Sequence, residues 1–113
     1  MMNPVTDADL VAFDGYMQKW QRILDLGSWR IERGSRRPKK NMAEVHFTDD
    51  AMLASYRVGM NFGAAAVTPD SLERTALHET LHVLLRKFKM EQTDANEHEI
   101  VNVLEKLLMD AKL

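Results

Sequence analysis

Hydrophobic and polar positions near the start of the chain follow the period of an α-helix. Apolar residues recur there every three or four positions, at Leu10, Phe13, Met17, Trp20 (or Gln21) and Leu24. Thr6 or Asp7 can cap the first turn, and Gly27 follows the pattern as a stop. The pattern therefore predicts a helix that begins after Thr6 and runs to about Leu26.

Three later segments alternate apolar and polar residues, which is the pattern of half-buried strands. They are Trp29–Arg33, Ala43–Phe47 and Tyr56–Phe62, and Asp49-Asp50 ends the second of them. Strands that follow one helix and precede two more indicate an α+β domain. We expect a small, mostly antiparallel, three-stranded sheet.

A second helix is predicted from Thr68-Pro69 to about Phe88. Proline is tolerated at the first helical position, and Asp70 with Glu73 forms a pair that resembles a capping box.

A last helix carries an apolar stripe that would pack against the rest of the domain. Thr93 and Asp94 are its expected caps. The stripe consists of Val101, Leu104, Leu108 and Ala111.

Length and composition restrict the kind of protein and the kind of site. The 113 residues fit one domain spanning 1–113, and a net charge of -2 argues against a general nucleic-acid binder. The chain has no cysteine, so any metal must be held by His, Asp, Glu or water. No signal peptide and no apolar run of about 20 residues is visible, so we expect a cytoplasmic protein without a membrane span.

The second predicted helix carries ionisable residues in the middle of an apolar run. His78 and His82 are four residues apart, so they lie one turn apart on the same face. Two imidazoles at that spacing can converge on one zinc ion, and Glu79 can reach a water without ligating the metal. This is the His-Glu-x-x-His pattern, in which the carboxylate serves as general base. The alternative is a pair of solvated histidines along a helix margin.

Catalytic zinc takes three protein ligands, so a further ligand is needed. The candidates are Glu97, His98 and Glu99 in the last predicted helix. Glu97 lies four residues before Val101 on the apolar stripe, which ranks it first, with His98 second and Glu99 third. The alternative for Glu97 is a capping box with Asp94.

Together the segments 77–85 (LHETLHVLL) and 97–102 (EHEIVN) resemble gluzincin-type zinc metallopeptidases, in which a later helix supplies a glutamate ligand. The order of elements resembles the shortest members, the minigluzincins, and peptidases encoded by phages and prophages. The resemblance implies a zincin-like fold, Zn2+ bound by His78, His82 and Glu97, Glu79 as base, and a peptide or protein substrate. It also implies an upper sheet edge, expected at Tyr56–Phe62, against which an extended substrate could pair.

Other polar residues have competing interpretations. Tyr56 could assist the oxyanion if it faces the cleft, although strand tyrosines usually pack. His46 is expected to be a packed or half-exposed strand residue. The basic residues of 33–40 are expected to form a solvated turn. The alternative function is a small phage-type zinc-binding protein without catalysis that contacts nucleic acid or a protein partner through this loop.

Overall fold

Three helices and a three-stranded sheet make up the part of the chain that the structure, a computed structural model, describes: residues 2–88 and 94–113. The elements are, in order, α1 (Asp7–Ile23), β1 (Arg30–Arg33), β2 (Ala43–Thr48), a 3-10 turn (Asp49–Ala51), β3 (Leu53–Val58), α2 (Pro69–Lys87) and α3 (Asp94–Asp110). The predicted α+β class is confirmed. Among the described residues, no helix is both long and apolar enough to cross a bilayer.

Helix α1 begins where the sequence predicted and ends slightly earlier. The Thr6 hydroxyl accepts from the Asp9 backbone N–H, and the Asp9 carboxylate accepts from the Thr6 N–H, so both ends of a capping box are formed. The helix ends at Ile23 rather than near Leu26, because Asp25 already adopts a left-handed φ of 55° that turns the chain.

The sheet is mixed, and its antiparallel ladder is the longer of the two. Its strand order is β1-β3-β2, with β3 antiparallel to β2 and parallel to β1. Residues 34–42 connect β1 to β2 across a gap of one strand, a step of roughly 10 Å at the usual strand spacing. The chain then returns through the 3-10 turn and β3 fills that gap.

Strand β3 covers Leu53–Val58, whereas the alternation had predicted Tyr56–Phe62. Its partners end there, since the last residue of β1 pairs with Tyr56 and the first residue of β2 pairs with Val58. The next residue, Gly59, lies close to the connection between β1 and β2. A Cβ placed on Gly59 would lie 2.6 Å from the Asn41 carbonyl oxygen, a contact that no larger residue tolerates.

Helix α2 has the predicted bounds to within a residue, but different residues cap it. The capping box is formed by Thr68 and Ser71, not by Asp70 and Glu73. The Glu73 carboxylate accepts hydrogen bonds from Lys19 and Trp20 instead, and so ties α2 to α1.

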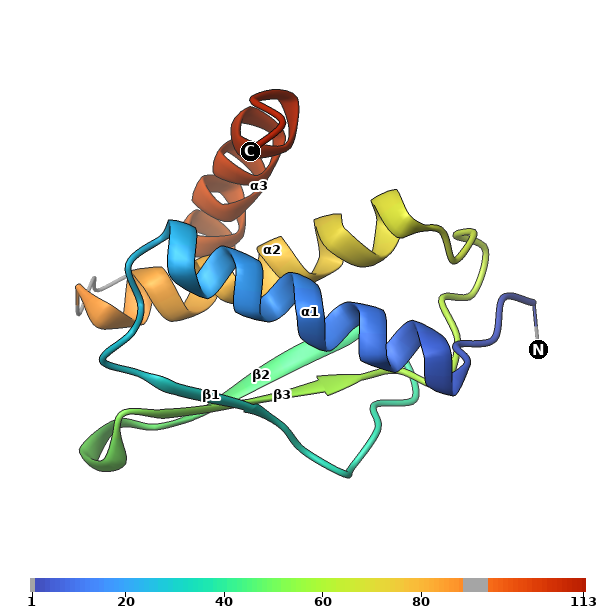
Figure 1. Cartoon of the computed structure of the whole chain (residues 1–113), viewed down its shortest axis with the longest axis horizontal. Coiled ribbons are helices and arrows are strands. Elements are labelled where there is room, and N and C mark those ends of the chain that lie inside the picture. Colours follow the sequence, from blue (N-terminus) through green and yellow to red (C-terminus); the bar gives the residue numbers. More distant parts are fainter. Residues whose placement is uncertain (1, 89–93) are drawn as a thin grey trace.

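Helices α1 and α2 lie side by side over one face of the sheet (Figure 1). The buried side chains of β3, Ala54, Tyr56 and Val58, point toward these helices. Because every second residue of β3 is buried, the strand has one core face, as its alternation predicts.

Helix α3 packs on α2 and extends away from the sheet (Figure 1). Val101 is fully buried against Leu77, Leu81 and Leu85 of α2, and Leu104 and Leu108 are partly buried beside them. The predicted stripe is therefore confirmed over those residues, while Ala111 is exposed beyond the end of the helix. Thr93 and the side chain of Asp94, the expected caps, lie outside the described residues.

Candidate metal centre

The two faces of α2 separate the apolar residues of the central run from its ionisable ones. Leu77, Leu81 and Leu85 pack into the core with Val101. His78 and His82 lie on the other side, facing a cavity, with their ring centroids 5.0 Å apart. The helix thus remains anchored in the core while it presents two imidazoles to one point.

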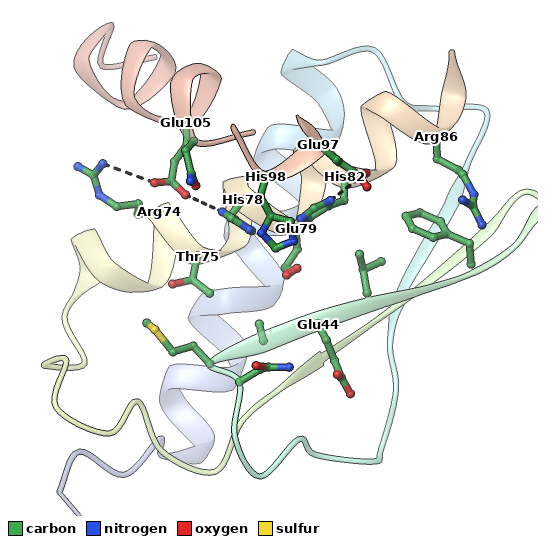
Figure 2. Close-up of a pocket in the computed structure, with 16 residues that line it drawn as sticks. Glu44, Arg74, Thr75, His78, Glu79, His82, Arg86, Glu97, His98 and Glu105 are labelled. Atoms are coloured by element: carbon green, nitrogen blue, oxygen red, sulfur yellow. Dashed lines mark hydrogen bonds and ion pairs between the residues drawn. The ribbon is translucent and has the colours of Figure 1, made fainter. Parts of the chain in front are cut away.

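Helix α3 contributes a polar face to the same cavity. His98, Asn102 and Glu105 follow one another at spacings of four and three residues, so they share one side of the helix. All three line the cavity, together with Glu97 in the preceding position. Figure 2 shows the side chains from the two helices directed toward one another.

A carboxylate on α3 orients each motif histidine (Figure 2). Glu105 Oε1 lies 3.1 Å from His78 Nδ1, and Glu97 Oε1 lies 3.0 Å from His82 Nδ1. An ionised carboxylate can only accept, so Nδ1 donates in both pairs. Each Nε2 is then the nitrogen available to an ion, and carboxylate–imidazole pairs of this kind are typical of metal sites.

The two imidazoles differ in their tendency to be protonated. The hydrogen bond to Glu105 raises the pKa of His78, against the effect of burial. Burial lowers the pKa of His82, and the hydrogen bond to Glu97 opposes this only in part. Metal ligation needs neutral imidazole, so His82 is the better prepared of the two before an ion binds.

Glu79 is buried beside the histidines with one oxygen unsatisfied. Its side chain points into the cavity (Figure 2), and the residue is 5% exposed. Oε2 has no hydrogen-bond partner within the described chain. Burial raises the pKa of this carboxyl to about 7, with His78 acting in the opposite direction. A buried acceptor without a donor is costly, and a water on a neighbouring metal would compensate it.

The group His78, Glu79 and His82 could hold a metal ion. One potential ligand atom from each residue lies within 4.8 Å of the others. The orientation of both Nδ1 atoms and the unsatisfied Glu79 oxygen fit this interpretation.

The three candidates for a further ligand lie in different environments. Glu97 is partly buried and already paired with His82. The His98 ring lies 5.9 Å from that of His78 and 5.3 Å from that of His82, measured between centroids. Glu99 is exposed and does not line the cavity, in keeping with its place as the third choice.

The cavity between β2, α2 and α3 has a volume of about 650 Å3. The sheet edge that borders it is β2, through residues that include Ala43, Glu44 and Val45. The expectation that Tyr56–Phe62 would form this edge is wrong, because β3 is the central strand and both its sides are paired. Any strand-like ligand beside the metal group must therefore approach β2.

Tyr56 belongs to the core, not to the cavity. Its hydroxyl donates to Asp14 Oδ1 at 2.6 Å, and its ring packs against Phe13. Burial, followed by the Asp14 hydrogen bond, raises the pKa of this hydroxyl. It is not available to an oxyanion in the cavity.

Two cations of the basic loop are engaged within the molecule. Arg33 pairs with Asp14, and Arg37 donates to the carbonyl oxygens of Val58 and Gly59. The segment expected to be a solvated turn therefore also holds elements of the fold together through Arg33 and Arg37. His46 is half-exposed on β2 next to Glu44 and does not line the cavity, in agreement with its expected role.

Glu105 was not among the residues predicted from the sequence. The available signal was the run of polar positions 98, 102 and 105 at helical spacing beside an apolar stripe. That pattern marks a second face of α3, but only the packing of α3 on α2 shows what this face meets.

Comparisons of the chain with protein-family models, with curated proteins and with solved structures found no match. The resemblance to gluzincins therefore rests on the motif residues, and the structure adds that His78, Glu79 and His82 could together hold a metal ion.

Proposed function

We propose that this chain is a zinc-dependent peptidase in which Glu79 is the general base. The observation that supports this most is the unsatisfied Glu79 Oε2 beside two imidazoles whose Nδ1 atoms are held by carboxylates. A buried carboxylate oxygen without a donor calls for a partner from outside the chain, and a water on a neighbouring metal ion would be such a partner.

His78 and His82 would hold the ion through Nε2. When bound, zinc supplies a Lewis acid that polarises a carbonyl group and acidifies water. Glu79 Oε2 accepts a proton from the attacking water and later gives it to the leaving amine. In the metal-free chain, burial raises the pKa of this carboxyl to about 7, and a bound cation would act in the opposite direction, toward the ionised form that accepts a proton.

Strand β2 suits an extended peptide as substrate. It is an edge strand, so its outer backbone groups are not used by the sheet, and it borders the cavity directly. A peptide that pairs with this edge would carry its backbone past Glu79. The hydrolysed bond would then be an amide in a strand-like segment.

Hydrolysis and metal content together test this function. The protein, purified without added metal, should carry about one zinc per chain. It should cleave an unfolded protein or a quenched fluorescent peptide library, and the cleavage should stop on chelation and return with zinc. Glu79→Gln, prepared in parallel, controls for contaminating peptidases. Trace metal with no uptake after dialysis against zinc would contradict the proposal.

The alternative, a non-catalytic zinc protein that contacts nucleic acid or a partner through the basic loop, receives less support. Arg33 and Arg37 are committed to internal contacts, which leaves Arg36, Lys39 and Lys40 for a partner. Binding of a duplex or single-stranded oligonucleotide that weakens steeply with salt would favour it.

A further inference from the structure

Three imidazoles, not two, face one another where α3 crosses α2. The His98 ring stands only slightly farther from His78 and His82 than these two stand from each other, at 5.9 and 5.3 Å compared with 5.0 Å between centroids. Figure 2 shows the three rings close together, next to Glu79. The ring nitrogens of His98 lie outside the group whose ligand atoms come within 4.8 Å of one another. Because His98 is exposed near the start of α3, its side chain can rotate toward the other two.

Glu97 is poorly placed to share that role. Its Oε1 lies 3.0 Å from His82 Nδ1, and Nδ1 and Nε2 are on opposite sides of the imidazole ring. A carboxylate paired with Nδ1 cannot also reach to within about 2.0–2.2 Å of an ion bound at Nε2. Glu105 stands in the same relation to His78.

We propose that His98 is the third metal ligand and that Glu97 and Glu105 are positioning residues that hold His82 and His78. The centre would then be a three-imidazole zinc site, a ligand set that leaves a fourth position open in catalytic zinc proteins. The inference rests on the proposed function only for the identity of the ion. It departs from the glutamate ligand that the gluzincin resemblance implies.

Long-range proton–nitrogen NMR of the wild-type protein tests the assignment without any substitution. The chain has four histidines, and the ring nitrogens of each can be followed as zinc is added to the metal-free protein. We expect the Nε2 signals of His78 and His82, and one ring nitrogen of His98, to move to metal-bound positions. The ring of His46, which is outside the cavity, serves as the internal control and should not move.

Zinc affinities of single variants, measured by competition with a chromophoric chelator, provide the second test. His98→Ala should weaken binding by more than about 100-fold, because a direct ligand is lost. Glu97→Gln and Glu105→Gln should weaken it by about 10–100-fold, the range for groups that orient a ligand, while all three imidazoles still respond to zinc. Glu99→Gln is a control on the same helix, and His46→Ala is a control with the same residue type as His98. Both should bind zinc as tightly as the wild type.

Two results would overturn the inference. One is a His98 ring that does not respond when zinc binds. The other is a Glu97→Gln variant that loses zinc as completely as His82→Ala, which would make Glu97 the ligand. In either case zinc-dependent, Glu79-dependent hydrolysis by the wild type would still support the proposed peptidase. A wild-type protein that takes up no zinc would refute both.

Discussion

The carboxylates on the two sides of the helical layer differ in burial and in hydrogen bonding, because Asp14 and Glu73 are partly exposed and Glu79 is buried. On the side toward α1, the Asp14 carboxylate accepts hydrogen bonds from Tyr56 and Arg33. The Glu73 carboxylate accepts hydrogen bonds from Lys19 and Trp20. On the cavity side, Glu79 keeps one oxygen without a hydrogen-bond partner in the described residues. Asp14 and Glu73 join elements of the fold, whereas Glu79 Oε2 lacks a hydrogen-bond donor from the described residues. Trp29 Nε1 and Arg57 Nε are also buried without a partner in the described part of the chain, but of these three groups Glu79 alone faces the cavity beside two imidazoles.

If Glu79 is the general base, as we propose, the largest expected effect is the loss of hydrolysis when its carboxylate is removed. Glu79→Gln keeps the shape of the side chain but cannot accept a proton, so we expect the rate to fall by about 10²–10⁴-fold. Zinc content should stay near one per chain, because Glu79 acts on water. Hydrolysis and zinc content are measured on the same preparation. A Glu79→Gln variant that still hydrolyses the substrate, or that loses zinc as His78→Ala does, would contradict this role.

The same substitution should stabilise the metal-free protein in alkaline solution. A folded-state pKa of about 7, against an ordinary value of 4.5, means that the folded chain holds this proton more tightly than the unfolded chain does. Stability is therefore lost as the pH rises from about 4.5 through 7, and the loss is complete above that.

Relative to wild type, Glu79→Gln should gain about 2–3 kcal/mol in free energy of unfolding between pH 5 and pH 8. Urea denaturation of both proteins in the presence of a chelator measures this difference. A gap that does not change with pH would show that Glu79 is not held in the unfavourable environment described above.

Removing a hydrogen bond from Asp14, by contrast, should lower the stability of the fold. Tyr56→Phe removes one hydrogen bond from Asp14, which retains Arg33, so we expect a loss of about 1 kcal/mol in stability. Zinc affinity and hydrolysis should match wild type. A fall in hydrolysis without a fall in stability would return Tyr56 to the oxyanion role that the sequence had left open.

The smallest effect is expected at the basic loop. Replacing Arg36, Lys39 and Lys40 with serine should change stability by less than about 0.5 kcal/mol, since exposed charges contribute little. Arg37→Ser, in contrast, removes the donor of two backbone carbonyl groups and should cost about 1–2 kcal/mol. Thermal unfolding of the triple and the single variant separates the two; equal losses would refute this division.

The sequence predicted those features that depend on neighbouring residues. The start of α1 at Thr6, the extent of α2, and the pairing of His78 with His82 on one face all follow from local spacing and capping. Val101, on the same predicted stripe as Glu97, is buried, and Glu97 itself lines the cavity.

Features that depend on contacts between distant segments were missed. The central position of β3 follows from the way the chain bridges a gap between β1 and β2, which no alternation of residues encodes. The pairing of Glu105 with His78 joins residues 27 positions apart and requires α3 to cross α2. The end of β3 was misplaced because it depends on where the partner strands β1 and β2 begin and end.

The way α3 is held has a consequence for how the molecule opens. Its principal packing partner is α2, and the two helices are also joined by the Glu105–His78 and Glu97–His82 pairs. An ion bound by residues from both helices would bridge them, so lifting α3 would require breaking that bridge. Local opening of α3 and release of the ion would then be thermodynamically linked. Where amide exchange in α3 follows the population of the open state, each RT ln 10 of ion-binding free energy would slow that exchange tenfold. The affinity of the site for its ion would thus also determine how rarely the last helix opens.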